Sequence, residues 1–352
     1  MEKKSLFLKV LIVGTFMSFF ACSGGHQVID DPSSSDNNDV DVYVVGEVTK
    51  DDASTHTTAT LWKNGEAMSL PYTDKDTYAS SVYVSGKDVY VAGSMMDSKG
   101  NETAILWKNG EAVALTDGNT YSVANSVYVS GQDVYVAGFI TDSEGFEIAT
   151  LWKNGKAMTM PLTGENTSSV ANSVYVSGSD VYVAGYEGNA TATIWKNGEA
   201  VALDVNAYSR AESIYVSGSD VYVAGAIGTA GDDERAFAAT LWKNGKQTLL
   251  RSDLYSSYAV SVCASGSDVY VAGFTMDYEG IYTATLWKNG EAVALTGENS
   301  SAYSVCASGK DVYVAGSMDS KGNATVIWKN GKAIMNWGNG APKSMMVVPR
   351  PQ

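Results

Sequence analysis

The chain has 352 residues, of which 45% are apolar and 18% charged, and its formal net charge is −15 at pH 7. This composition supports a large, multilayered core. The acidic excess repels phosphate backbones and anionic lipid, which excludes nucleic acid as a partner. With only two histidines, His26 and His56, and three cysteines, the chain lacks the ligands for a metal site of the Cys/His type.

The N-terminal segment predicts an exported protein. Two lysines, Lys3 and Lys4, precede an apolar run from Val10 to Phe20 that ends at Ala21-Cys22. The run is too short for a permanent membrane span, so residues 1–21 are predicted to be a signal peptide. Ala21-Cys22 resembles a bacterial lipobox, which implies a lipid on Cys22; the alternative is ordinary signal cleavage that leaves a free thiol.

The residues after Cys22 indicate where the protein resides. Ser23 follows the cysteine in place of aspartate, and by resemblance to known sorting rules this favours the outer membrane of the cell envelope. Residues 22–39 are rich in Ser, Asp and Gly, a composition typical of a flexible tether. The partner expected at this end is therefore the membrane, reached through the lipid on Cys22.

A repeat of about 45 residues fills the rest of the chain. It reads SVYVSGKDVYVAG, a variable stretch, and then AILWKNGEAVAL. Its tryptophan recurs with steps of 45, 45, 43, 47, 45 and 41 residues, at Trp62, Trp107, Trp152, Trp195, Trp242, Trp287 and Trp328. A period in this range is typical of the blades of a β-propeller.

Turn residues divide each repeat into four strands. In the copy that begins at Ser81, strands are expected over Ser81–Ser85, Val89–Ala92, Ala104–Lys108 and Glu111–Leu115. Asn109-Gly110, between the last two, is a strong signal for a two-residue hairpin. The VYV runs do not alternate apolar with polar residues, so both faces of the sheet are expected to be covered.

The two ends of the repeat region predict how the ring closes. The first copy begins at Asp41 without the SVYVS strand, whereas the tail Ser344–Val348 matches that strand, with Met346 in the tyrosine position. The tail is therefore expected to complete the first blade. The fold class predicted is all-β: a seven-bladed β-propeller of four-stranded antiparallel blades over residues 40–348, followed by a short tail, 349–352.

With these features the chain resembles seven-bladed β-propeller lipoproteins, whose ring closes as in WD40-type proteins. The resemblance covers architecture only. The WD and GH signatures of WD40 repeats and the paired glycines of kelch repeats are absent, so it assigns no functional residue.

No motif for catalysis, a metal or a cofactor is present. One aspartate per copy precedes the second strand, and these seven carboxylates are expected on one end of the ring: Asp41, Asp88, Asp133, Asp180, Asp220, Asp268 and Asp311. They form either an annulus that attracts cations or seven separate turn caps that bond local N–H groups. Two cysteines, Cys263 and Cys306, replace the strand tyrosine in successive copies and are either buried free thiols or a disulfide.

The strand aromatics, such as Trp107 and Tyr90, are expected in the core between blades. The links on the opposite end of the ring vary in length and sequence, which makes that end the predicted working face. It carries the aromatic residues predicted to bind a ligand: Tyr121, Tyr208, Tyr255, Tyr258, Tyr303 and Trp337. The alternative is that these loops fold on their own aromatics.

Three functions are compatible with the sequence. The first is a non-catalytic scaffold that binds a glycan or a protein through the variable face. The second is a structural subunit of an outer-membrane complex. The third is a carboxylate-dependent glycan hydrolase or lyase, for which the acidic loop Asp232-Asp233-Glu234 is the best candidate.

Overall fold

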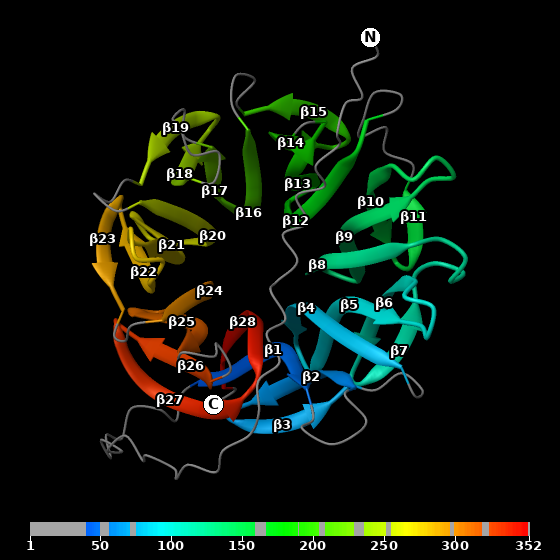
Figure 1. Cartoon of the computed structure of the whole chain (residues 1–352), viewed down its shortest axis with the longest axis horizontal. Coiled ribbons are helices and arrows are strands. Elements are labelled where there is room, and N and C mark those ends of the chain that lie inside the picture. Colours follow the sequence, from blue (N-terminus) through cyan, green and yellow to red (C-terminus); the bar gives the residue numbers. More distant parts are fainter. Residues whose placement is uncertain are drawn as a thin grey trace.

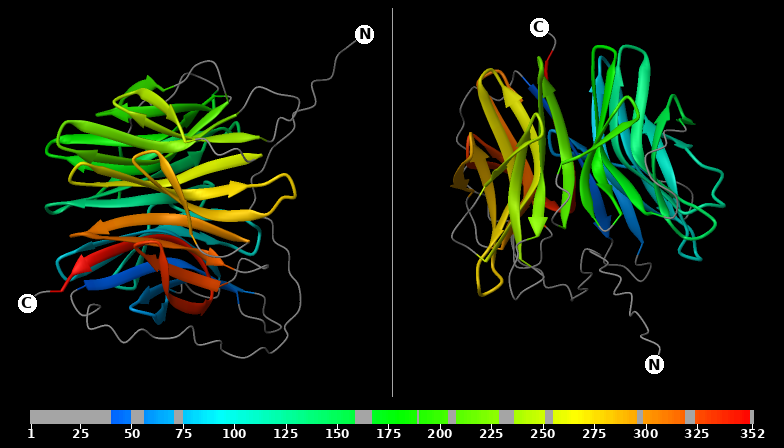
Figure 2. Two further views of the ribbon diagram at one scale, coloured as in Figure 1. Left: turned by 90° about the vertical axis from the view of Figure 1, so that its left-hand side faces the viewer. Right: turned by 90° about the horizontal axis from the view of Figure 1, so that it is seen from above.

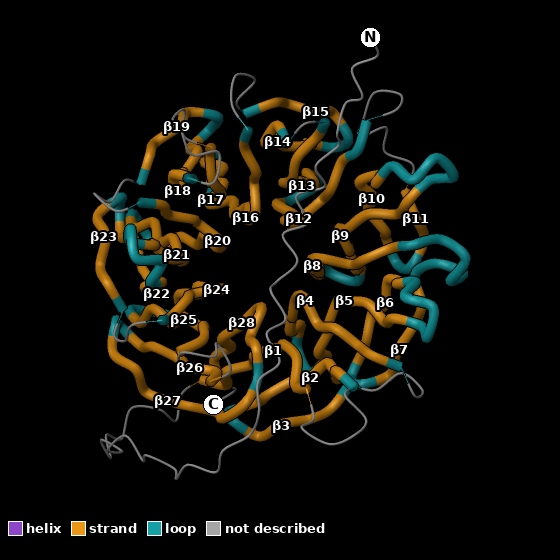
Figure 3. The backbone as a smooth tube through the Cα atoms, in the orientation of Figure 1, coloured by secondary structure: helices purple, strands orange, loops and turns teal. Residues whose placement is uncertain are grey.

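Seven four-stranded antiparallel sheets stand around a central axis, and the prediction of a seven-bladed β-propeller is confirmed (Figure 1). The computed structural model describes residues 40–49, 56–70, 75–158, 167–188, 190–203, 208–228, 236–250, 255–295, 299–318 and 324–350. Within these ranges every regular element is a strand (Figure 3). The predicted signal peptide, Cys22, the tether and the Asp232–Glu234 loop lie outside the described residues.

Each blade has an inner strand beside the axis, a second strand, a third strand and an outer strand. The inner strands of blades one to seven are β28 (Ala341–Pro349), β4 (Asp76–Ser85), β8 (Ser122–Ser130), β12 (Ser169–Ser177), β16 (Ser209–Ser217), β20 (Ser256–Ser265) and β24 (Ser300–Ser308). The second strands, in the same order, are β1 (Val40–Thr49), β5 (Asp88–Met96), β9 (Asp133–Thr141), β13 (Asp180–Glu187), β17 (Asp220–Gly228), β21 (Asp268–Met276) and β25 (Asp311–Met318).

The third strands are β2 (Thr57–Lys63), β6 (Glu102–Lys108), β10 (Glu147–Lys153), β14 (Thr191–Lys196), β18 (Phe237–Lys243), β22 (Tyr282–Lys288) and β26 (Ala324–Lys329). The outer strands are β3 (Glu66–Ser69), β7 (Glu111–Ala114), β11 (Lys156–Met158), β15 (Glu199–Ala202), β19 (Lys246–Leu249), β23 (Glu291–Ala294) and β27 (Lys332–Asn339). Antiparallel order puts all the short turns on one end of the ring, the turn end, and all the variable links on the other, the loop end (Figure 2).

The core lies between blades. The seven repeat tryptophans are at most 2% exposed, and strand tyrosines such as Tyr90 and Tyr135 are 7% exposed, so their predicted role in the core is confirmed. Asn109 and Gly110 both have positive φ, 52° and 86°. A two-residue hairpin of the expected kind requires these values.

The ring closes as predicted. β28 pairs with β1 so that Met346 lies opposite Tyr43, the place that Tyr83 takes opposite Tyr90 in blade two. The first and last strands of the chain therefore share one sheet (Figure 1).

The inner strands are longer than predicted. β4 begins at Asp76 and not at Ser81 because a β-bulge between Ala79 and Ser81 leaves Ser80 unpaired and lets the strand continue past it. Gly93 lies opposite this bulge, and a Cβ there would collide with the carbonyl oxygen of Tyr78. The bulge explains why the second strands carry glycine at this position.

Candidate functional site

The loop-end half of the central channel contains a cavity of 390 Å³ with a polar wall. The residues that line it come from all seven inner strands and from β1: Glu47, Ser80, Ser81, Asn125, Ser126, Asn172, Ser173, Glu212, Ser213, Val260, Ser261, Tyr303, Ser304, Lys343 and Ser344. Val260 is the one aliphatic side chain among them. Hydroxyl, amide and charged groups therefore face the interior.

Two rings of residues make this wall, together with Glu47 of β1. The first consists of the seven bulge residues: Ser80, Asn125, Asn172, Glu212, Val260, Tyr303 and Lys343. Their neighbours in the strand hardly change from copy to copy, whereas this position changes in nearly every one. Sequence reasoning singled out Tyr303 and missed the other six, although a single variable position inside a repeated strand was the available signal.

The second ring is the serine belt, formed by the serine that follows each bulge residue. Each serine Oγ accepts a hydrogen bond from a backbone N–H of the next blade, as Ser81 does from Val127 at 3.2 Å and Ser213 from Val262 at 3.2 Å. The belt is continuous because Ser304 accepts from Met345 at 3.0 Å and Ser344 from Val82 at 3.4 Å. It fixes the spacing of the bulge residues around the channel.

Carboxylates enter the cavity from two sides. Glu212 accepts hydrogen bonds from the Tyr258 hydroxyl at 2.5 Å and from Asn172 Nδ2 at 3.0 Å. Glu47 lies 3.8 Å from Lys343 Nζ. Burial raises the pKa of both carboxyl groups, and these partners offset the effect only in part.

An aromatic cluster lies beside Glu212 on blades four to six, and we define it as Tyr186, Tyr208, Phe237, Tyr258, Phe274 and Tyr282. The rings of Phe237 and Tyr258 are 5.9 Å apart, and those of Tyr258 and Phe274 are stacked at 5.9 Å. Aromatic faces next to hydroxyl and carboxylate groups are typical of sites that recognise an amphipathic ligand.

Arg210, on β16, joins the aromatic cluster to the cavity. Its Cζ lies 4.7 Å from the ring centre of Tyr186 and 5.6 Å from that of Tyr208. Its Nη2 donates a hydrogen bond to the Tyr208 hydroxyl at 2.9 Å. Arg210 precedes Glu212 by two residues on β16, but it is not among the residues that line the cavity.

The structure separates the six aromatic residues predicted to bind a ligand. Tyr208 and Tyr258 belong to the aromatic cluster, and Tyr303 lines the cavity, with its hydroxyl 3.3 Å from Ser317 Oγ. The other three pack elsewhere: Tyr121 stacks on Phe139, Tyr255 meets Tyr278 edge to face, and Trp337 lies beside Gly65. Trp337 was expected in a link, but it lies in β27, because this outer strand is longer than those of the other blades.

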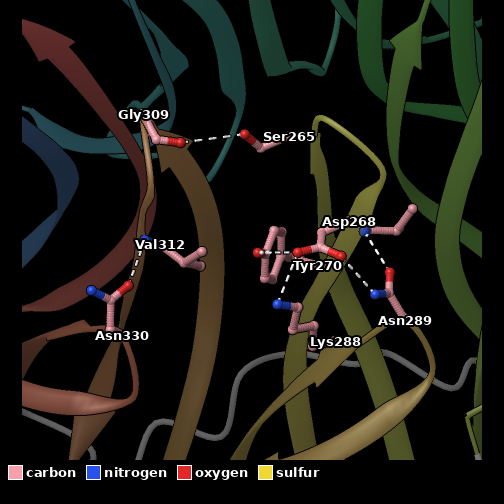
Figure 4. A network of polar contacts seen from close by, with 9 residues as sticks. Ser265, Asp268, Tyr270, Lys288, Asn289, Gly309, Val312 and Asn330 are labelled. Atoms are coloured by element: carbon pink, nitrogen blue, oxygen red, sulfur yellow. Dashed lines mark hydrogen bonds and ion pairs between the residues drawn. The ribbon is translucent and has the colours of Figure 1, made fainter.

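The seven aspartates at the turn end are all engaged within their own blades, and Figure 4 shows Asp268 as an example. Asp268 accepts a hydrogen bond from Asn289 Nδ2 at 2.8 Å and pairs with Lys288 at 2.8 Å, and the lysine Nζ lies 5.6 Å from the ring centre of Tyr270. The local N–H, that of Val269, bonds to Asn289 Oδ1 at 2.8 Å. The turn-cap interpretation was therefore wrong in its detail, since asparagine caps the backbone and aspartate binds the asparagine.

No group of three or more His, Cys, Asp or Glu side chains able to hold a metal ion occurs among the described residues. The described part of the chain also contains no helix long and apolar enough to cross a membrane.

Both internal cysteines are free: Cys263 is buried and Cys306 half-buried. They continue a ladder of tyrosines on the turn-end side of the serine belt. Its ring centres are 4.8 Å apart for Tyr83 and Tyr128, and 5.1 Å for Tyr175 and Tyr215. Burial raises the pKa of both thiols, so they stay protonated at neutral pH.

No protein-family model matches the sequence. No curated protein is significantly similar to it. Among solved structures, an acylaminoacyl peptidase from Pyrococcus horikoshii aligns over 86% of this chain and 51% of its own, at 13% identity and a TM-score of 0.49. The chain thus spans about half the length of that peptidase, and the likeness carries no functional assignment.

Proposed function

We propose that this protein is a non-catalytic binding protein of the cell envelope that holds a glycan at the loop end of its channel. The observation that carries the proposal is the 390 Å³ cavity, whose wall is polar apart from one aliphatic side chain. The aromatic cluster lies beside this cavity on blades four to six. The fold alone would not distinguish this role from many others.

The chemistry of a sugar fits both parts of this site. Sugar hydroxyls need hydrogen-bond partners when they leave water, and the bulge residues and the serine belt supply them. The C–H faces of a sugar ring bury well against aromatic rings, as the stacked pair Tyr258 and Phe274 offers.

A glycan array, followed by titration of the best ligand, tests the proposal. We expect Tyr208→Ala to weaken binding by about 1 to 3 kcal/mol, as for a hot-spot aromatic. Tyr255→Ala is the matched control, because Tyr255 packs on Tyr278 outside the aromatic cluster. Equal losses for both variants, or no glycan bound at all, would contradict the assignment.

A second function, glycan hydrolysis or cleavage by a lyase, has one observation in its favour. Glu47 and Glu212 line the same cavity, and burial raises the pKa of both, a property of catalytic acids. Incubation with the glycan that binds best, with new reducing ends measured over time, separates the two functions. Product formation that disappears in Glu212→Gln would replace the binding role with catalysis.

We also propose that a lipid on Cys22 holds the protein at the outer membrane, in line with the Ala21-Cys22 sequence. We expect Cys22→Ser to move the protein from the membrane pellet to the soluble fraction. A variant that stays in the pellet would show that Cys22 is not the anchor.

A further inference from the structure

Arg210 is a charged side chain that the polar cavity does not explain. Among the described residues no carboxylate oxygen lies within ion-pair distance of it. By contrast, in each of the seven blades a lysine at the turn end pairs with an aspartate. Glu212 is the nearest acidic residue in sequence, but its oxygens bond to Tyr258 and Asn172.

The part of the chain that the structure describes supplies few acceptors for the donors of Arg210. Nη2 donates to the Tyr208 hydroxyl, whereas Nε is buried and has no acceptor among the described residues. A buried donor without an acceptor is costly, so each such group calls for an explanation. An acidic ligand that reorganises this corner would supply the missing acceptors.

The surroundings fix the orientation of the guanidinium. Its carbon lies 4.7 Å from the ring centre of Tyr186 and 5.6 Å from that of Tyr208. The N–H groups of a guanidinium point outward in its plane, so a ligand would accept hydrogen bonds at the edge of that plane. Its register partner on β17 is Ala226, a small residue. A planar guanidinium fork matches the two oxygens of a carboxylate.

The repeat shows that Arg210 is not needed for the fold. The same strand position holds Val123 in β8 and Val170 in β12, each opposite an aromatic residue of the second strand, Phe139 and Tyr186. Blades three and four thus form with an apolar residue there, and blade five alone replaces it with a cation beside the aromatic cluster.

We propose that Arg210 selects acidic glycans, by pairing with the carboxylate of a uronic acid whose ring lies against the aromatic cluster and whose hydroxyls reach Asn172 and Glu212. This inference rests on the proposed glycan-binding function and names its ligand class. It places the acidic sugar on blades four to six and the rest of the glycan over the cavity.

The test compares matched pairs of ligands on the purified full chain. The probes are oligomers of galacturonate, glucuronate and mannuronate, each beside its carboxyl-reduced neutral counterpart, titrated by calorimetry. We expect at least one uronate to bind about 10- to 100-fold more tightly than its neutral partner. Arg210→Val, which copies Val123 and Val170, should abolish that preference while the melting temperature stays unchanged.

Lys99→Ser is the matched control, because Lys99 is an exposed cation in a link at the same end of the ring; it should keep the preference. Equal binding of acidic and neutral oligomers, or a preference that survives Arg210→Val, overturns the role of Arg210 and leaves glycan binding standing. Binding of no oligomer overturns both. Preference for a sulfated oligomer over every uronate overturns the carboxylate assignment.

Discussion

Each blade is locked at the turn end by one group of four side chains. In blade two, Asp88 pairs with Lys108 at 2.9 Å and accepts from Asn109 at 2.9 Å, while the lysine Nζ lies 5.2 Å from the ring centre of Tyr90. Such exposed pairs individually stabilise little. Their contribution is to tie the hairpin of the third and outer strands to the start of the second strand in every blade.

Among the turn-end aspartates, Asp41 has the carboxylate that we expect to stabilise the fold most. Burial raises its pKa, but hydrogen bonds from Asn64, Arg350 and Lys63 outweigh that effect and lower the pKa to about 2. Its side chain is 20% exposed, against 40% for Asp88. At Asp41 an arginine joins the group: Arg350, which directly follows β28, has its Nε 2.7 Å from Oδ1.

We therefore predict that Asp41→Asn lowers the free energy of unfolding by about 2 kcal/mol at pH 7. A carboxylate whose folded pKa is depressed stabilises the fold above its unfolded pKa of about 3.9 and loses this effect as the pH falls through the folded pKa. The difference between wild type and variant should thus shrink from pH 4 toward pH 2 in thermal or denaturant unfolding. Asp88→Asn is the control and should cost less; a difference that is constant with pH would refute the assignment.

The inner strand is the element on which the site depends. Its bulge turns one residue per blade into the cavity wall, and the serine after it links that blade to the next. Because the belt is a closed circle, each inner strand is held by its neighbours on both sides.

Breaking one link of the belt tests this view. Ser213→Ala would leave the N–H of Val262 without its acceptor, so we expect a loss of about 1 to 3 kcal/mol in the free energy of unfolding. Ser217→Ala, an exposed position on the same strand, should change it by less than about 0.5 kcal/mol. If the two variants unfold alike, the belt is not a source of stability.

The strands show what the sequence could and could not predict. Asn109-Gly110 and the two-sided apolar VYV runs correctly predicted hairpins and buried strands, since both depend on neighbouring residues. The position of Ser80 in the cavity wall could not be predicted in this way, because a bulge breaks the alternation of side chains between the two faces of the sheet. Arg210 was missed as well, since its surroundings, Tyr186 and Tyr208, come from two blades and meet only when the ring has formed.

The whole ring depends on one sheet that combines both ends of the chain. β28 pairs with β1 along its length and supplies Ser344 to the serine belt and Lys343 to the cavity. The cavity wall is therefore complete only when β28 has closed the ring.

Deletion of residues 343–352 should open the ring. Blade one would lose most of its inner strand and expose the edge of β1 and the face of blade seven, so we expect the melting temperature to fall by about 10 °C or more. Deletion of residues 23–36, ahead of β1, is the control and should leave it unchanged. Calorimetry on both deletions checks this, and equal melting temperatures would contradict the closure.

Because blade one combines strands from both ends of the described chain, it is the last blade that can be completed during synthesis. β1 is among the first strands to leave the ribosome and β28 is the last, and Asp41 and Arg350, which meet across them, are 309 positions apart. A growing chain can complete six blades as it emerges, but it must carry β1 to β3 as an unfinished sheet until synthesis ends. Closing so long a loop adds little thermodynamic cost, since that cost grows only with the logarithm of length, but contacts so far apart in sequence form slowly. The unfinished sheet thus leaves a strand edge unpaired in the nascent chain, and it is where a chaperone would be needed during synthesis.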